Sequence, residues 1–286
     1  MSSLDYLSEL VINRFITLAL AEDVGEGDHS SLCCIDKEAE DKAKLIIKDE
    51  GILAGANLAE RILLHIDPTV KFISYIKDGS HVSHGDIAFE VHGKAHTILK
   101  GERLLLNCMQ RMSGIATYTQ HLVSLIEGTN AKLLDTRKTT PNFRPFEKWA
   151  VLIGGGQNHR YNLADMIMLK DNHIDYAGGV IPAIQKAKQY VQEKKLNIDI
   201  EVETRDIEEV KQALTEGGVK RIMLDNMSCE QMVEAVNIIG EQAETEASGG
   251  INEETIRQVA ETGVDYISIG ALTHSYQSLD MSLKAF

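Results

Sequence analysis

The chain has 286 residues, 43% of them hydrophobic, which is enough to build one large α/β domain or two smaller domains. Its 29 Lys and Arg residues stand against 43 Asp and Glu residues, a formal charge of -14, and this acidic balance argues against binding to nucleic acid or to anionic lipid. Four cysteines without a Cys-x-x-Cys pattern predict neither a disulfide framework nor a thiolate zinc site, and they suit a reducing, cytoplasmic setting.

The sequence also lacks targeting and membrane signals. The first ten residues contain no basic segment, and no apolar run approaches the roughly 18 residues that a membrane span needs. We therefore expect a mature, soluble protein with no membrane partner. Anionic small molecules are compatible with this composition wherever the local charge is positive.

The first part of the chain predicts an α+β domain. Apolar residues recur at helical spacing over residues 4–22 and 58–65. Strand-like runs cover residues 44–48, 51–55, 71–75 and 87–91. Because these runs cluster without regular helical crossovers, they favour an antiparallel sheet. Helical spacing returns over residues 98–127, where Ser113-Gly114 predicts a break.

The remainder alternates short strands with helices. Parallel strands joined by helical crossovers form either an open doubly wound sheet or a barrel, and six or seven such units favour a β/α barrel. The predicted strands lie near residues 132–134, 166–169, 199–202, 221–224, 243–246 and 266–269.

Polar or small residues follow every one of these strands. In a β/α barrel the carboxyl ends of the strands meet around one mouth, where such folds hold their active sites. The residues concerned are Asp135, Arg137, Lys138, Lys170, Glu201, Glu203, Asp225, Asn226, Glu246, Ser248 and Gly270.

Positive charge is concentrated in one window of this acidic chain. Residues 131–173 contain seven Lys or Arg and four Asp or Glu, a net charge of +3. Arg137, Lys138, Arg160 and Lys170 suit a substrate with several carboxylates or phosphates, because Arg binds such groups bidentately and Lys acts as a point charge. The alternative is a set of surface salt bridges, and the agreement of six strand ends favours the binding site.

The acidic residues leave several roles open. Glu201 and Glu203 share one face of a strand, and Asp225 ends the next strand. These carboxylates could hold a divalent cation, bind sugar hydroxyls or stabilise a developing positive charge. They could also simply neutralise Lys138 and Lys170.

Glycines near the end of the chain predict a phosphate site. Ser248-Gly249-Gly250 and Gly270-Ala271 follow the last two strands, where small residues let backbone N–H groups approach a phosphate. In contrast, Gly154-Gly155-Gly156 does not fit Gly-x-Gly-x-x-Gly, so no dinucleotide site is expected there.

Many of these motifs resemble the quinolinate phosphoribosyltransferase family. They follow one another in the family's order over about two thirds of the chain. After Pro141 the family commonly has Gly-Leu-Arg, whereas this chain has Asn142-Phe143-Arg144. The matching runs include Gly101-Glu102-Arg103, Ser113-Gly114-Ile115-Ala116-Thr117, Asp135-Thr136-Arg137-Lys138-Thr139-Thr140-Pro141, Asn158-His159-Arg160, Lys170-Asp171-Asn172-His173, Glu201-Val202-Glu203, Leu224-Asp225-Asn226 and Ser248-Gly249-Gly250.

The resemblance implies a fold, a reaction and an assembly. The fold is an N-terminal α+β sandwich over residues 1–112 and an incomplete barrel of six or seven strands over residues 113–274, with the tail 275–286 packing back on the first domain. The reaction joins quinolinate to phosphoribosyl pyrophosphate with Mg2+, giving nicotinate mononucleotide, pyrophosphate and CO2. The assembly is a homodimer in which Arg103 reaches the active site of the neighbouring subunit.

The resemblance also implies roles for individual residues. Quinolinate would be held by Arg137, Lys138, His159, Arg160 and Arg103 of the partner subunit, and Thr136 would be a further substrate-binding residue. Glu203 and Asp225 would stabilise charge at the ribose and hold Mg2+, and Lys170 would neutralise the leaving group. Lys138, Lys170, Glu203 and Asp225 are thus the predicted catalytic residues, and Ser248, Gly249, Gly250, Gly270 and Ala271 the predicted 5-phosphate site.

Two alternatives compete with this hypothesis. One is a lyase that forms a Schiff base on Lys170, which would leave the arginines and the glycine turn partly unexplained. The other is an anion-binding or molybdenum-associated relative that retains the fold without this activity. The presence of all the basic and acidic residues at the strand ends argues against lost catalysis.

Overall fold

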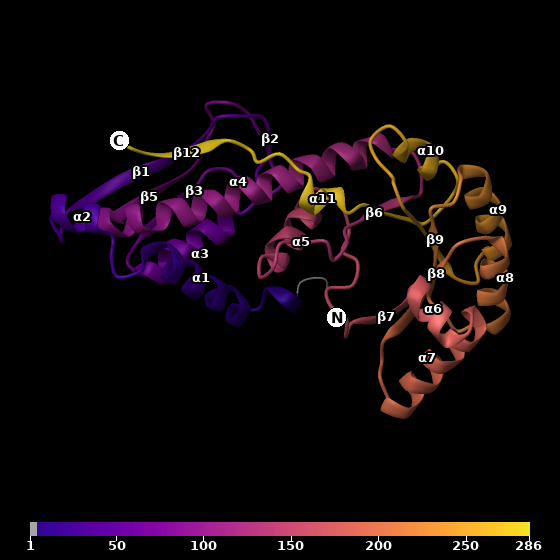
Figure 1. The fold of residues 1–286 in the computed structure, drawn as a ribbon. Coiled ribbons are helices and arrows are strands. Elements are labelled where there is room, and N and C mark those ends of the chain that lie inside the picture. The colour runs from indigo at the N-terminus through magenta and orange to yellow at the C-terminus, as the bar shows by residue number, and fades with distance from the viewer. Residues whose placement is uncertain (1–4) are drawn as a thin grey trace. The chain divides into compact units, whose positions relative to one another are not determined.

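The computed structural model describes residues 5–286 and divides into two compact units (Figure 1). The first unit contains the chain through Gln120 together with Thr139–Gly155 and Ala271–Phe286. The second unit contains His121–Lys138 and Gly156–Gly270. None of the helices in the described part of the chain is both long enough and apolar enough to cross a membrane.

The first unit is built on an antiparallel sheet, as predicted. Its strands β1 (Glu40–Ile47), β3 (Lys71–Ser74), β5 (Ile87–Lys94) and β12 (Met281–Ala285) follow the order β12-β1-β5-β3. Apolar residues alternate along β1, so Ala43, Leu45 and Ile47 are buried on one face. The short strands β2 (Gly51–Ile52) and β4 (His81–Val82) form a second ladder.

The C-terminal tail completes this first sheet. β12 pairs antiparallel with β1, and Leu45 lies opposite Leu283. The edge of β1 is therefore covered by a segment from the far end of the chain. The helices of this unit are η1 (Asp5–Leu7), α1 (Glu9–Val24), α2 (His29–Cys34), α3 (Ala56–Ile66), α5 (Arg144–Ile153), α11 (Ala271–His274) and most of α4 (Ala95–Leu125).

Helix α4 is continuous through Ser113-Gly114, so the predicted break is wrong. The glycine is needed for close approach, because a Cβ on Gly114 would lie 2.1 Å from the carbonyl oxygen of Gln277. The hydroxyl of Ser113 donates a hydrogen bond to the carbonyl of Ala54 and accepts one from the backbone N–H of Ala54. Small residues in mid-helix therefore mark tight packing and not a helix end.

The loop before α5 takes a conformation that explains its unusual sequence. Asn142 has a φ of 63°, in the left-handed region that glycine adopts freely and that asparagine tolerates better than most residues. The next residue, Phe143, packs against Phe15 and Phe146, with ring centroids 5.4 and 5.1 Å away. Asn142 thus takes the left-handed turn position, and Phe143 anchors the loop through aromatic contacts.

The second unit is a parallel sheet of six strands covered by helices, which confirms the predicted fold class. The order is β6-β11-β10-β9-β8-β7, so the sheet is open between β6 and β7. A single bridge between Leu134 and Gln157 extends it beyond β6. The strands are β6 (Lys132–Leu134), β7 (Met166–Leu169), β8 (Asp199–Thr204), β9 (Arg221–Asp225), β10 (Glu244–Ser248) and β11 (Tyr266–Ser268).

The two faces of this sheet differ in polarity. Along β8, Ile200 and Val202 point to one face, and Glu201 and Glu203 to the other. The apolar face is covered by crossover helices that pack against the strands (Figure 1), and the opposite face collects charged side chains. The helices are α6 (Asp171–Ala177), α7 (Val180–Lys194), α8 (Ile207–Glu216), α9 (Cys229–Ile239) and α10 (Ile256–Ala260).

We expect Gly114→Ala to destabilise the protein, although a glycine-to-alanine change inside a helix normally stabilises by about 0.5–1 kcal/mol. The added methyl group would collide with the backbone at Gln277, and overpacking of this kind costs about 1–3 kcal/mol. Urea denaturation measures the change in the free energy of unfolding. The control is Gln120→Ala at an exposed position of the same helix, which should stay within about 0.5 kcal/mol of wild type. A stabilised Gly114→Ala protein would contradict the packing described here.

Candidate active site

The carboxyl ends of the six parallel strands place most of the predicted site residues along one edge of the second sheet. We call this the carboxyl edge. Because the strands are parallel and hydrogen-bonded in one sheet, residues that follow them in the chain emerge on the same side. The residues that follow or end the strands are Thr136, Arg137 and Lys138 (β6), Lys170 (β7), Glu203 (β8), Asp225 (β9), Ser248 to Gly250 (β10) and Gly270 (β11).

Two arginines approach each other at this edge. Burial lowers the pKa of Arg160, and the nearby charge of Arg137 lowers it further. The guanidinium of Arg160 donates from Nη1 to the carbonyl of Met166 at 3.0 Å, which fixes its direction. Lys138 is exposed, and its backbone N–H donates to the hydroxyl of Thr136. Two like charges so close together create a strong local attraction for an anion.

Carboxylates lie on the neighbouring strands of the same edge. Glu203 is 7% exposed and lies 3.3 Å from Nζ of Lys170. Asp225 is half-buried and accepts a hydrogen bond from the side-chain amide of Asn226 at 2.7 Å. The register pairs Glu203 with Met223, two residues before Asp225, so both acids point to the same face of the sheet.

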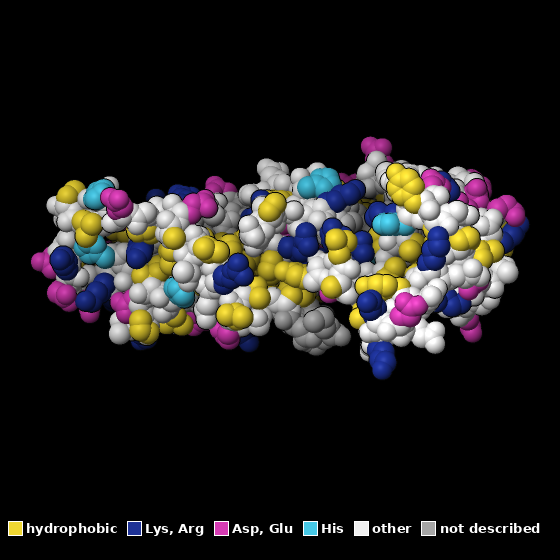
Figure 2. All heavy atoms as spheres, turned by 60° about the horizontal axis from the view of Figure 1, so that its bottom comes forward, with side chains coloured by type: hydrophobic (Ala, Val, Ile, Leu, Met, Phe, Trp, Pro, Cys, Tyr) yellow, Lys and Arg dark blue, Asp and Glu magenta, His cyan; other side chains and the backbone are white. Residues whose placement is uncertain are grey.

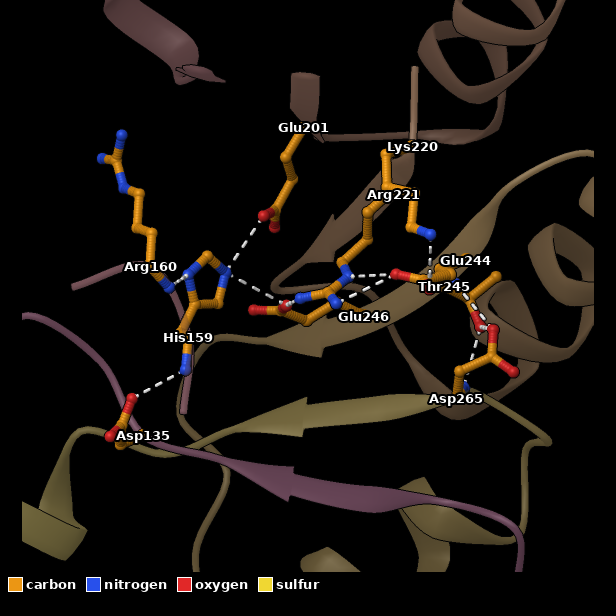
Figure 3. A network of polar contacts seen from close by, with 10 residues as sticks. All are labelled: Asp135, His159, Arg160, Glu201, Lys220, Arg221, Glu244, Thr245, Glu246 and Asp265. Carbon is orange, nitrogen blue, oxygen red and sulfur yellow. Dashed lines mark hydrogen bonds and ion pairs between the residues drawn. The ribbon is translucent and has the colours of Figure 1, made fainter. Parts of the chain in front are cut away.

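A buried cluster of charged groups lies deeper along the same strands (Figure 3). The Nε2 atom of His159 is 3.0 Å from Glu201 and 3.3 Å from Glu246. Arg221 contacts Glu246 at 2.8 Å and Glu244 at 2.9 Å. Glu201 and Glu246 are fully buried, and the side chain of His159 is 5% exposed, so the members of this cluster depend on one another for charge compensation.

The environment shifts the pKa values of this cluster in opposite directions. Burial raises the pKa of Glu201. Burial acts the same way on Glu246, but its contacts with His159 and the charge of Arg221 outweigh that effect and lower the pKa. Burial alone would lower the pKa of His159, whereas hydrogen bonds to Glu201 and Glu246 raise it to about 9.

Asp135 anchors the segment that contains His159 and Arg160. This residue is fully buried. Its carboxylate accepts hydrogen bonds from the side-chain amide of Asn158 at 2.7 Å and from the backbone N–H of His159 at 2.8 Å. The sequence pattern predicted a side chain at the mouth, whereas Asp135 is fully buried and holds Asn158 and the backbone of His159.

The turn after β10 brings backbone close to a neighbouring strand end. Gly249 has a φ of 96°, and a Cβ there would lie 2.2 Å from Oδ1 of Asn226. Asn226 itself has a φ of 55°. Two adjacent strand ends are therefore fitted to each other, and only glycine satisfies both the conformation and the space.

Some predicted residues lie in the first unit. Arg103 is exposed on α4, and Ala271 begins α11 directly after Gly270. On the face drawn in Figure 2, Lys and Arg side chains are interspersed with acidic and hydrophobic ones.

Sequence reasoning missed the role of Arg221. A signal was present, because alternation along Arg-Ile-Met-Leu-Asp places Arg221 and Asp225 on the same face as the glutamates of β8. A second missed feature is Glu147, which is fully buried in the first unit, pairs with Arg111 at 2.6 Å and accepts from the N–H of Thr140. It fixes the loop that follows Lys138 in the chain.

Parallel strands that gather cations, carboxylates and a glycine turn at their carboxyl ends define a class of protein. It is an α/β protein with charged side chains gathered where β/α enzymes hold their active sites.

Comparison with known proteins assigns the family. Residues 28–113 match the N-terminal domain and residues 115–284 the C-terminal domain of quinolinate phosphoribosyl transferase. The chain belongs to this family. It is 46% identical over 288 residues to the chloroplastic nicotinate-nucleotide pyrophosphorylase (carboxylating) of Arabidopsis thaliana, covering 96% of this chain and 82% of that protein. It is 47% identical over 284 residues to quinolinate phosphoribosyltransferase (decarboxylating) 1b of Nicotiana tabacum, covering 94% and 81%.

Solved structures agree with this assignment. NadC from Streptococcus pyogenes is 40% identical, with a TM-score of 0.91 and coverage of 97% of this chain and 96% of that one. The nicotinate-nucleotide pyrophosphorylase from Francisella tularensis is 36% identical, with a TM-score of 0.92 and full coverage of both chains. Both units of the fold are therefore found together in the relatives.

We expect Asp135→Asn to reduce the free energy of unfolding by about 1–3 kcal/mol, the cost of leaving a buried donor unsatisfied. The amide nitrogen of the new side chain would face either the Asn158 amide or the His159 N–H, and both are donors. Urea denaturation provides the measurement. The control is Asp199→Asn, which changes an exposed residue at the opposite end of β8 and should have little effect. Equal stability of the two variants would show that Asp135 does not anchor this segment.

Proposed function

We propose that this chain transfers the phosphoribosyl group from phosphoribosyl pyrophosphate to quinolinate with loss of CO2, forming nicotinate mononucleotide and pyrophosphate in NAD biosynthesis. The observation that carries the proposal is the pair Arg137 and Arg160 beside Glu203 and Asp225 on one edge of one sheet. A dicarboxylate requires the first pair, and a ribose that becomes cationic requires the second.

Binding of quinolinate is assigned to the basic residues that follow β6 and precede β7. Each charge-assisted hydrogen bond to a carboxylate contributes about 1.5–3 kcal/mol. Arg137 and Arg160 offer planar, bidentate donors, and Lys138 offers a point charge next to the hydroxyl of Thr136. His159 already contacts Glu201 and Glu246. Its contribution to quinolinate binding is therefore assigned to holding the neighbouring Arg160 in position.

Transfer proceeds by attack of the ring nitrogen of quinolinate on C1 of the ribose. The C1–oxygen bond to pyrophosphate breaks, its electron pair leaves with pyrophosphate, and C1 becomes positively charged on the way. Glu203 and Asp225 stabilise that charge or bind the ribose hydroxyls, and Lys170 neutralises the leaving group. The distance of 3.3 Å between Lys170 and Glu203 supports placing both at the reacting centre.

Decarboxylation then needs little from the protein. The alkylated ring nitrogen is cationic, and it stabilises the electron pair left on the adjacent ring carbon when the carboxylate departs as CO2. That carbon then takes up a proton. No nucleophilic side chain has to form a covalent bond in this sequence.

The carboxylates present also fit Mg2+. Glu203 and Asp225 come from adjacent strands and point to one face, and Mg2+ is commonly held by one or two carboxylates together with substrate phosphates. When bound, Mg2+ supplies neutralisation of the pyrophosphate charge. The 5-phosphate is assigned to Ser248, Gly249 and Gly250, with Gly270 and Ala271, since Gly249 has a positive φ and turns of small residues let backbone N–H groups approach an anion.

A homodimer with shared sites is part of the proposal. Arg103 is exposed on α4, within a motif that matches the family, and an exposed arginine on a helix is suited to reach into another subunit. In that arrangement Arg103 of the partner subunit adds one more cation to the quinolinate site.

The protein should release CO2 and pyrophosphate in equal amounts from quinolinate, phosphoribosyl pyrophosphate and Mg2+. Carboxyl-labelled quinolinate and a coupled pyrophosphate assay give both products. Chelation of Mg2+ should remove the activity, and added Mg2+ should restore it. Nicotinate serves as the matched substrate because it has only one of the two carboxylates.

Two results would refute the proposed function. One is the absence of both products under these conditions. The other is transfer to nicotinate as efficient as transfer to quinolinate, since the arginine pair would then have no dicarboxylate to recognise.

Mixed dimers test the shared site. Arg103→Ala and Lys170→Ala should each be nearly inactive. If the two variants exchange subunits, one site in each heterodimer carries neither change, so the mixture should recover about a quarter of the wild-type activity.

The control variant is Arg14→Ala, another exposed arginine of the first unit. It should be active by itself and should not change when mixed with wild type. Failure of the two inactive variants to recover, with subunit exchange verified by mass spectrometry, would contradict the shared site.

A further inference from the structure

Glu246 and Arg221 lie behind the residues assigned to the substrate, yet they connect to them. Arg221 contacts Glu246 at 2.8 Å, and Glu246 lies 3.3 Å from Nε2 of His159. The other ring nitrogen, Nδ1, lies 2.7 Å from the backbone N–H of Arg160, which donates to it. A continuous chain of polar contacts therefore runs from β9 through β10 to Arg160 (Figure 3).

The direction of these hydrogen bonds fixes the tautomer of His159. A backbone N–H can only donate, so Nδ1 must present a lone pair to Arg160. The single ring proton then lies on Nε2, between the carboxylates of Glu201 and Glu246. The carboxylates raise the pKa of this ring, but a second proton on Nδ1 would meet the Arg160 N–H at 2.7 Å. Of the two neutral tautomers, the Nε2–H form is the one that leaves Nδ1 able to accept from Arg160.

The same three side chains could be read as a metal site. Single ligand atoms of His159, Glu201 and Glu246 lie within 4.8 Å of one another. A metal on Nε2 would require Nδ1 to carry the ring proton and donate it. Nδ1 here accepts a hydrogen bond, and Arg221 already compensates Glu246, so the geometry favours a relay of ion pairs and hydrogen bonds over a metal.

This relay fixes the backbone of Arg160. Its guanidinium is held at one end by the carbonyl of Met166 at 3.0 Å. Its backbone N–H is held at the other end by His159. Repulsion from Arg137, whose charge contributes to lowering the pKa of Arg160, tends to push this side chain away, so both anchors are needed to keep two like charges converging on one ligand.

We propose that Glu246, held by Arg221, is a positioning residue for dicarboxylate binding, because it fixes the His159 ring and through it the backbone of Arg160. The inference rests on the proposed function and extends it to residues that do not touch the substrate. A change at Glu246 should weaken quinolinate binding alone, because ground state and transition state use the Arg160 guanidinium equally.

The test compares two carboxylates on one strand. Glu246→Gln removes the charge that faces His159, and Glu244→Gln removes the other carboxylate on Arg221, which makes no contact with His159 among the described residues. For Glu246→Gln we expect KM for quinolinate to rise about tenfold or more, with kcat and KM for phosphoribosyl pyrophosphate within about twofold of wild type. Glu244→Gln should leave all three values within about twofold.

A measurement on the wild-type protein covers the case in which Glu246→Gln does not fold. Nitrogen-15 NMR with labelled histidine should show His159 as the Nε2–H tautomer, with its signals assigned by their loss in His159→Gln. An Nδ1–H tautomer, or a stoichiometric bound metal that is lost in His159→Gln but kept in Glu203→Gln, would overturn the relay.

The kinetic outcomes separate the two proposals. Wild-type protein that is inactive on quinolinate refutes the proposed function and the inference with it. Active wild type together with a folded Glu246→Gln variant of unchanged KM for quinolinate refutes the inference alone, as does an equal rise of KM in Glu244→Gln.

Discussion

The second unit depends on one constraint. Its buried carboxylates must compensate the positive charges that converge at the carboxyl edge. Burial and the nearby charge of Arg137 lower the pKa of Arg160, because two like charges near each other are unfavourable in the absence of a ligand. Behind them, Asp135, Glu201 and Glu246 are all fully buried. Asp135 holds the backbone, and the two glutamates hold His159, so the repulsion between the arginines is balanced within the same sheet.

The alternation of side chains along parallel strands produces this arrangement. One face of each strand supplies apolar residues to the helices, as Ile200 and Val202 do, and the other supplies charge, as Glu201 and Glu203 do. Position along the strand then decides the role. Glu201 is sealed against His159, whereas Glu203, two residues closer to the strand end, meets Lys170. A chain with a net charge of -14 can in this way expose a positive site while most of its nearby acids face inward.

The positions of the parallel strands and the set of residues near the carboxyl edge could be predicted from the sequence. Short apolar runs alternate with helices and end in charged groups. How deeply each charged side chain is buried could not be predicted. Glu201 and Glu203 look equivalent in the sequence, and Asp135 reads as a mouth residue although Gln157 and the backbone of His159 enclose it. The helix break predicted at Gly114 was wrong for a related reason. The sequence alone does not distinguish a glycine that permits close packing from one that ends a helix. These distinctions depend on contacts between segments far apart in the chain.

A crystal structure with quinolinate bound is the most direct test of the account. Both carboxylates of the ligand should contact the guanidinium groups of Arg137 and Arg160, with the ring nitrogen directed toward Glu203 and Asp225. Quinolinate bound away from the carboxyl edge, or held there without either arginine, would contradict the claim that these cations are kept together for a dicarboxylate.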